Sequence, residues 1–317
     1  MNETMQAHKD HWVITLVGRS SVEQALKPVA GVLKEQGLRV GGIKALSGAQ
    51  QLEDARKYAC AEIDAQGPVG DEAGMRTAFL ALSDELAVDV VFQQESAYRQ
   101  ERQLFVFDMD STLIQGEVID ELAKMAGVAD RVVAVTASAM RGEIEFQESF
   151  RRRVALLAGL PEARTRELLD RIPLMEGAER LFRTLKARGA KTAILSGGFT
   201  FFGAYLKEKL GVDYVFANEL DVDADGYVTG AVRGQIVDGA RKAALLMEIT
   251  SREGIRLEQV VAVGDGANDL PMLRLAGMGV AFHAKPIVRA SAAFSMTHVG
   301  LDGLLYLLGI PDWEWTE

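Results

Sequence analysis

Apolar and polar positions in the first third of the chain predict two rounds of strand and helix. Residues 12–17 are largely apolar, which favours a strand, and apolar residues recur at helical spacing over 21–36, where Gly37 would end the helix. Further strands are expected near 38–46, 57–65 and 87–93, and a second helix over 71–86. Strand-helix-strand twice over is typical of a ferredoxin-like α+β fold.

A different pattern begins after the polar segment 94–103. Short apolar runs alternate with amphipathic helices, which predicts an α/β domain with a parallel sheet and crossover helices. The expected strands are 104–107, 191–195, 214–217, 260–263 and 278–282. Only helical patterns occupy about 118–176, so we expect a cap there, above the carboxyl end of the first strand. The predicted domains are therefore 1–97 and 98–317.

Length, charge and cysteine content narrow the class of protein. A chain of 317 residues is long enough for two domains, each with its own core. A net charge of −10 argues against a nucleic acid or an anionic membrane as the main partner. Cys60 is the single cysteine and cannot form an internal disulfide, and no apolar run approaches the ~20 residues that span a bilayer. We expect a cytoplasmic protein whose main partner is neither a nucleic acid nor a membrane.

The most informative stretch is the apolar run 104–107 followed by Asp108 and Asp110. Parallel sheets bind ligands beyond the carboxyl ends of their strands, and residues two apart in an extended segment point to the same side. These two carboxylates could therefore act together on one substrate, one as nucleophile and the other as proton donor.

The same Asp-x-Asp spacing recurs in Asp221–Gly226, which begins like a calcium-binding loop. Position 12 of such a loop would be a bidentate Glu, but here it is Val232. The flanking apolar runs favour a β-hairpin with its turn at the Asp-Gly pair.

Polar clusters follow two more predicted strands. Ser196-Gly197-Gly198 follows 191–195, the segment Gly264–Asp269 follows 260–263, and Lys242 lies between the two clusters. Carboxyl ends of parallel strands meet at one edge of a sheet, so we expect these groups to converge on Asp108. Asp108, Asp110 and Asp265 would repel one another, which indicates that a hard cation such as Mg²⁺, together with Lys242, offsets the charge.

The motifs Asp-x-Asp-x-Thr, Ser-Gly-Gly, Lys and Gly-Asp-Gly-x-Asn-Asp, in this order, resemble those of the haloacid dehalogenase superfamily over residues 104 to about 300. The resemblance implies a Rossmann-like parallel sheet with a helical cap inserted after the first strand. It also implies phosphoryl transfer to Asp108, with Asp110 as general acid and base. The implied contacts are metal ligation by Asp108, the Asp110 carbonyl and Asp265, phosphate binding by Ser196, Gly197, Lys242 and Asn268, and a supporting position for Asp269.

Residues of the cap narrow the substrate class. Phe146 and Arg153 are seven residues apart, so one helix would carry both on one face, and Met140 precedes them. Glu117 could bind an ammonium group and Arg153 a carboxylate, while Met140 and Phe146 exclude water. This set resembles the phosphoserine phosphatase family, which implies hydrolysis of O-phospho-L-serine to serine and phosphate, the last step of serine biosynthesis.

Two questions stay open at this point. The N-terminal region resembles an ACT domain, but it carries Gly18-Arg19-Ser20-Ser21 where that family has an Asp-x-Pro-Gly-like turn, so it could bind an amino acid or serve as a homodimerisation module. Identical core motifs also allow transfer of the phosphoryl group to another alcohol, cleavage of another small monoester, or a non-catalytic sensor.

Overall fold

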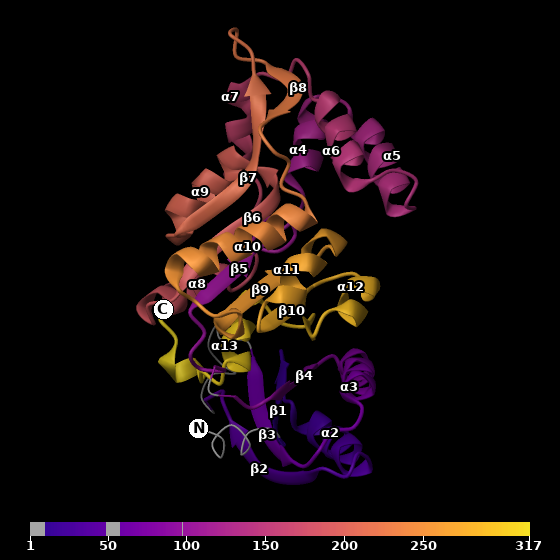
Figure 1. Ribbon diagram of the computed structural model, residues 1–317, viewed down its shortest axis with the longest axis vertical. Helices are drawn as coiled ribbons and strands as arrows, with labels where there is room; N and C mark the ends of the chain where they lie inside the picture. Colours follow the sequence, from indigo (N-terminus) through magenta and orange to yellow (C-terminus); the bar gives the residue numbers. More distant parts are fainter. Residues whose placement is uncertain (1–9, 49–57, 97) are drawn as a thin grey trace.

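The computed structural model describes residues 10–48, 58–96 and 98–317, which form two β-sheets with helices (Figure 1). The smaller sheet has the order β2-β3-β1-β4, and the larger has the order β11-β10-β9-β5-β6-β7-β8. The predicted fold class is confirmed. The domain division after residue 97 stays a prediction. Residues 1 and 97, the predicted limits of the first domain, and residue 57, the predicted start of a strand, lie outside the described residues.

The smaller sheet is antiparallel, with β1 paired to both β3 and β4. Helices α2 and α3 cover one face, and Gly37 follows α2 with a φ of 76°, a left-handed conformation that glycine adopts without strain. The elements are β1 (His11–Gly18), α2 (Glu23–Glu35), β2 (Arg39–Ala45), β3 (Ala59–Gln66), α3 (Glu72–Leu86) and β4 (Asp89–Gln94).

The larger sheet is parallel apart from one hairpin at its edge. Its strands are β5 (Leu104–Phe107), β6 (Lys191–Phe199), β7 (Tyr214–Val222), β8 (Val228–Arg233), β9 (Val260–Gly264), β10 (Met278–Phe282) and β11 (Phe294–Met296). The five expected strands are present, β6 and β7 run further than predicted, and β11 was not predicted. Asp221–Gly226 forms the end of β7 and the hairpin turn, since Val222 pairs with Val228.

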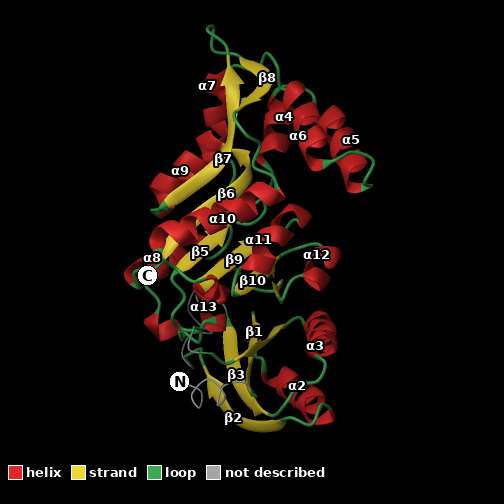
Figure 2. Cartoon of the chain, viewed as in Figure 1, coloured by secondary structure: helices red, strands yellow, loops and turns green. Residues whose placement is uncertain are grey.

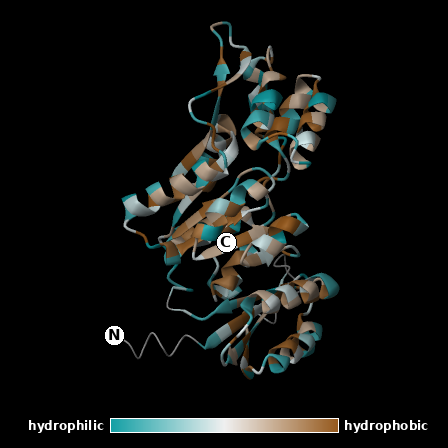
Figure 3. Cartoon of the chain, turned by 45° about the vertical axis from the view of Figure 1, so that its right-hand side comes forward, coloured by the Kyte–Doolittle hydropathy of each residue, from teal (hydrophilic) through white to brown (hydrophobic). Residues whose placement is uncertain are grey.

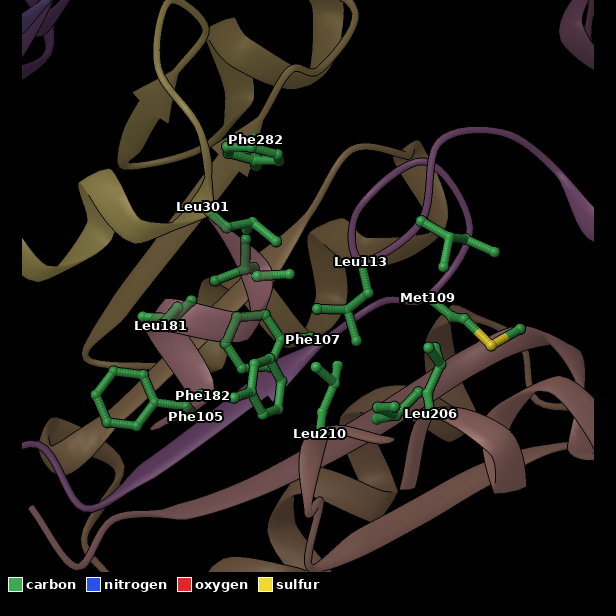
Figure 4. Packing of buried hydrophobic residues seen from close by; sticks show 14 of the residues in the cluster. Phe105, Phe107, Met109, Leu113, Leu181, Phe182, Leu206, Leu210, Phe282 and Leu301 are labelled. Carbon is green, nitrogen blue, oxygen red and sulfur yellow. The ribbon is translucent and has the colours of Figure 1, made fainter. Parts of the chain in front are cut away.

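Helices lie on both faces of this sheet (Figure 2). They are α8 (Ala178–Ala187), α9 (Thr200–Leu210), α10 (Gly239–Glu253), α11 (Leu270–Leu275), α12 (Pro286–Ser291) and α13 (Leu304–Leu307). Strand β5 is buried on both sides: Phe105 and Phe107 belong to one core cluster, whereas Leu104 and Val106 belong to another. The ring of Phe107 lies 5.0 Å from that of Phe182 on α8 (Figure 4). Close packing on two faces fixes the position of the residue that follows β5.

The insertion after β5 is helical, as predicted. It contains α4 (Val118–Met125), α5 (Ala129–Met140), α6 (Phe146–Ala155) and α7 (Glu162–Thr165), and an isolated bridge joins Ile114 to Leu174 where the insertion begins and ends. Hydrophobic residues concentrate on the strands of the central sheet, and polar residues on outward helix faces (Figure 3). Among the described residues, no helix combines the length and apolarity needed to cross a bilayer.

Hydrogen bonds join the smaller sheet to the C-terminal part of the chain. The buried Asp89 carboxylate accepts from the backbone N–H groups of Thr297 (2.7 Å) and His298 (3.0 Å). Gln93 donates to the Leu307 carbonyl at 2.8 Å, and Cys60 is buried in a cluster that includes residues of α13. The two sheets are therefore joined by polar contacts and a shared apolar core.

Candidate active site

Three carboxylates converge beyond the carboxyl ends of β5 and β9. Phe107 pairs with Val263 in the parallel ladder, so Asp108 and Asp265 leave the sheet at the same edge. Asp269 lies in the short 3₁₀ turn that follows, and one oxygen of each of the three side chains lies within 4.8 Å of the others. The predicted convergence of Asp108 and Asp265 is thus present in the structure, with Asp269 closer to them than expected.

Lys242, on α10, lies between two of these carboxylates. Its Nζ is 2.8 Å from Asp108 Oδ1 and 2.6 Å from Asp269 Oδ1, and its side chain is 0% exposed. Burial alone would lower the pKa of Lys242, but the charges of Asp108 and Asp269 raise it above its ordinary value. The site therefore holds a permanent cation beside Asp108.

One lysine does not balance three carboxylates. The pKa of Asp265 is raised to about 8 and that of Asp269 to about 6. Burial is the larger cause for both groups, and the charge of Asp108 is the second. Asp269 already uses both oxygens, one with Lys242 and one accepting from the Gly266 N–H at 2.9 Å. Oxygen donors with surplus negative charge fit a hard divalent cation, and Asp108 and Asp265 are the side chains with an oxygen to offer it.

The side chain of Asp110 lies outside this cluster of three. Its Oδ1 accepts from the Val118 N–H at 2.9 Å, and a Cβ on Gly198 would come within 2.3 Å of its Oδ2. Burial, and next the charge of Glu117, raise the pKa of Asp110 well above its usual range. This carboxyl group is therefore suited to hold a proton between Asp108 and Gly198, near the end of β6.

The turn after Asp110 carries two contacts that the sequence did not reveal. Ser111 adopts a left-handed conformation with a φ of 56°, and its hydroxyl donates to Glu117 at 3.0 Å. Thr112 is buried and its hydroxyl donates to Asp265 Oδ1 at 3.3 Å. The sequence marked Thr112 only as the Thr of the Asp-x-Asp-x-Thr motif, and the motif does not indicate that its hydroxyl bonds to Asp265.

The predicted phosphate-binding residues Ser196, Gly197 and Gly198 lie within the last part of β6, where the pairing with β7 is irregular, and hydrogen bonds hold them in place. The buried Ser196 hydroxyl accepts from the Gly198 N–H at 2.9 Å. Asn218, on β7, donates to the Gly197 carbonyl at 2.8 Å and accepts from Val237 at 2.9 Å. Asn218 was missed because no motif surrounds it. Asn268 is half-buried in the 3₁₀ turn that also carries Asp269.

Three of the four predicted substrate residues face this region. Burial and the charge of Asp108 raise the pKa of Glu117, whereas burial lowers the pKa of Arg153 against the opposing effect of Glu117. Arg153 Nε is buried without a hydrogen-bond partner in the described part of the chain. Phe146 reaches Gly197 on β6, because a Cβ on that glycine would lie 3.2 Å from the Phe146 ring.

Met140 was expected to exclude water from the substrate, but in the structure it lies on the surface. Its side chain is 65% exposed at the end of α5, and its sulfur lies 3.9 Å from Lys285 Nζ. A second contact between the cap and the α/β core was not predicted: Gln147 donates to Asp238, the N-cap of α10, at 2.6 Å. The cap is therefore attached to the helix that carries Lys242.

Comparison with known proteins agrees with this geometry. The chain belongs to the haloacid dehalogenase-like hydrolases, whose family model matches residues 105–274. A phosphoserine phosphatase from Archaeoglobus fulgidus is 47% identical over 241 residues, which are 76% of this chain and 70% of the relative. Another, from Streptomyces coelicolor, is 41% identical over 298 residues, or 94% of this chain and 70% of the relative. The predicted resemblance to the phosphoserine phosphatase family is confirmed.

One solved structure extends the similarity over both sheets. A haloacid dehalogenase family hydrolase from Salmonella enterica has a TM-score of 0.82 and 30% identity, and the match covers 94% of this chain and 98% of that chain.

Proposed function

We propose that this enzyme hydrolyses O-phospho-L-serine to serine and phosphate through an aspartyl-phosphate on Asp108. The observation that carries the proposal is the position of Asp108, held at the end of a buried strand with Lys242 on one oxygen and Asp265 beside it. Relatives that are 41–47% identical are phosphoserine phosphatases. The substitution of Asp108 by Asn is the direct test, because it removes the nucleophilic oxygen and keeps the shape of the side chain.

The side chains define a two-step reaction. Asp108 Oδ1 accepts from the Met109 N–H and contacts Lys242, which leaves the second oxygen to attack phosphorus in line. As the bond from phosphorus to the serine oxygen breaks, protonated Asp110 gives its proton to that oxygen. Asp110, now a carboxylate, then takes a proton from the water that attacks phosphorus and restores Asp108.

The other residues hold the phosphoryl group and balance its charge. Ser196, the Gly197 N–H, Asn268 and Lys242 are the proposed donors to its oxygens. Asp108, Asp265 and the backbone carbonyl of Asp110 would hold Mg²⁺, which when bound supplies charge neutralisation at the phosphoryl oxygens. Asp269 has a supporting role, because it positions Lys242 and the turn at Gly266.

Removal of the metal should make stability depend on pH in a defined direction. Without metal, Asp265 (pKa about 8) and Asp269 (about 6) bind protons in the native state more tightly than in the unfolded chain, where the value is 3.8. The native state then holds more protons between about pH 4 and about pH 8, so stability falls as pH rises. We expect the Tm in EDTA to decrease across this window, and Mg²⁺ to raise the Tm more at pH 8 than at pH 5.5.

Matched variants separate this effect from general pH sensitivity. Asp265→Asn should flatten the decline in EDTA and reduce the gain from Mg²⁺, whereas Asp225→Asn, at an exposed turn position, should keep the wild-type profile. A wild-type Tm in EDTA that rises from pH 5.5 to 8 would contradict the assignment.

Recognition of the amino-acid part is assigned to the cap. Glu117 would pair with the ammonium group and Arg153, whose Nε lacks a partner in the described residues, with the carboxylate. Phe146 would exclude water beside Gly197, and Met140 stays a predicted contact that requires the cap to close further.

Glu117→Gln and Arg153→Ala should therefore discriminate between substrates. We expect each to lower kcat/KM for phosphoserine by about 10²–10³, the equivalent of one lost charge-assisted contact, while hydrolysis of an aryl phosphate changes by less than about threefold. Steady-state kinetics on both substrates measure the effect, with Arg151→Ala on the exposed side of the same helix as control. Equal losses on both substrates would remove these residues from recognition.

A homodimer through the N-terminal sheet is also proposed. Strand β2 is an edge strand with almost every residue exposed, and Ile43 on it is 57% exposed. Exposed edges with an apolar side chain favour pairing with another chain. Sedimentation equilibrium should give a dimer that Ile43→Lys weakens, and a wild-type monomer at micromolar concentration would refute the pairing.

A further inference from the structure

A cavity of about 450 Å³ lies between the two sheets, away from the carboxylate cluster. Residues of α3 and β4 line one side, and residues of α11, α12 and β11 line the other. Figure 1 shows α3 and α12 facing each other across this boundary. A volume of this size accommodates a small metabolite.

Arginines from three different helices line the cavity. Arg76 comes from α3, Arg274 from α11 and Arg289 from α12. The acidic neighbours are Glu72, 3.4 Å from Arg76, and Asp84, 2.6 Å from Arg289. Arg274 makes no ion pair with any residue that the structure describes. Positive charge therefore exceeds negative charge at this cavity, in a chain whose net charge is −10.

Arg76 supplies a donor that the protein leaves unused. Its Nε is buried and has no hydrogen-bond acceptor among the described residues, while its guanidinium carbon lies 5.8 Å from the centre of the Phe294 ring. Buried donors in native proteins nearly always have a partner, and leaving one unpaired costs about 1–3 kcal/mol. An acceptor on a ligand in the cavity would satisfy this group.

The remaining lining determines what else the ligand carries. Phe79, Leu80 and Phe294 provide apolar surface, and Ser83 and Ser295 provide hydroxyl groups. The planar guanidinium group of arginine matches the geometry of both carboxylate and phosphate oxygens. The expected ligand is therefore a small molecule that carries one of these anionic groups on a short, partly apolar skeleton. We infer that this cavity is a binding site for a small organic anion, held by Arg76, Arg274 and Arg289.

Such a ligand would contact both sheets at once. Arg289 on α12 already pairs with Asp84 on α3, and β4 beside it bonds to the chain that follows β11 through Asp89. A ligand that bridges the same two parts stabilises their association, since binding to the folded state alone raises the free energy of unfolding.

The test uses malonate and inorganic phosphate as probes of the full chain by isothermal titration calorimetry. Malonate has no phosphoryl group and cannot be turned over, so its binding does not depend on the proposed reaction. Both probes can also enter the active site, where Arg153 could bind a carboxylate, and the cavity variant separates the two places. The variant Arg76→Gln/Arg274→Gln removes two cavity charges. The control Lys27→Gln/Lys34→Gln removes two exposed charges from α2 on the same sheet.

We expect wild type to bind at least one probe saturably, the cavity variant to bind it at least tenfold more weakly, and the control to match wild type. Malonate binding that the cavity variant weakens would identify a carboxylate site. If wild type binds phosphate at two sites and the cavity variant at only one, the cavity is a phosphate site. Phosphoserine turnover without probe should be unchanged in both variants, which shows that they fold. Absence of saturable binding to wild type, or equal binding by the cavity variant, would overturn the inference.

Discussion

Asp108→Asn is expected to lower kcat for O-phosphoserine by about 10⁴-fold or more, because the substitution keeps the shape of the side chain but removes the oxygen nucleophile. The amide can still occupy the place beside Met109 and Lys242, so the loss should be chemical rather than structural. Phosphate release from phosphoserine with Mg²⁺ measures the rate. Urea unfolding, with a midpoint close to that of wild type, would establish that the variant is folded.

A labelling experiment makes the same prediction specific to Asp108. Wild type mixed with phosphoserine labelled at phosphorus and quenched in acid should retain label on the protein, and Asp108→Asn should retain none. Asp225→Asn, at an exposed position in the hairpin turn, should behave like wild type. Label that persists on the Asn variant would place the intermediate on another residue and end the proposed mechanism.

The parts of this site that could be predicted from sequence are those fixed by local pattern and strand topology. An apolar run of four residues, directly followed by Asp108, defined a buried strand, and its pairing with β9 brought Asp265 to the same edge. Lys242 was expected because it lies between the two later polar clusters, in the motif order of the haloacid dehalogenase superfamily. These inferences succeed because chain direction in a parallel sheet determines which residues meet.

Contacts between distant segments could not be predicted in this way. Asn218 donates a hydrogen bond to the Gly197 carbonyl from the neighbouring strand, and Gln147 joins the cap to Asp238. No periodicity or spacing in the sequence marks either residue for its contact. Strand β11 was missed because three residues are too few to show alternation. The solvent exposure of Met140 depends on the position of the cap relative to the α/β core, and no local sequence pattern determines that position.

Lys242→Met is also expected to have a large effect, because it removes the one cation that, among the described residues, contacts both Asp108 and Asp269. Removing one partner from a buried ion pair typically costs about 3–5 kcal/mol, so the free energy of unfolding measured in EDTA should fall by that amount. The activity should fall by about 10³ or more, since a donor to the phosphoryl oxygens is also lost. Lys209→Met, an exposed lysine on α9, should change stability by less than about 0.5 kcal/mol.

A second substitution separates the stabilising role of Lys242 from its catalytic role. In Lys242→Met/Asp269→Asn one buried negative charge disappears together with the cation, so a large part of the lost stability should return while the rate stays low. This follows because stability depends on the charge balance of the cluster, whereas phosphoryl transfer requires a cation at the position of Nζ. Urea unfolding in EDTA and phosphate release with Mg²⁺ measure the two quantities. If activity returned along with stability, Lys242 would matter only for charge balance, and its assignment as a phosphate ligand would be wrong.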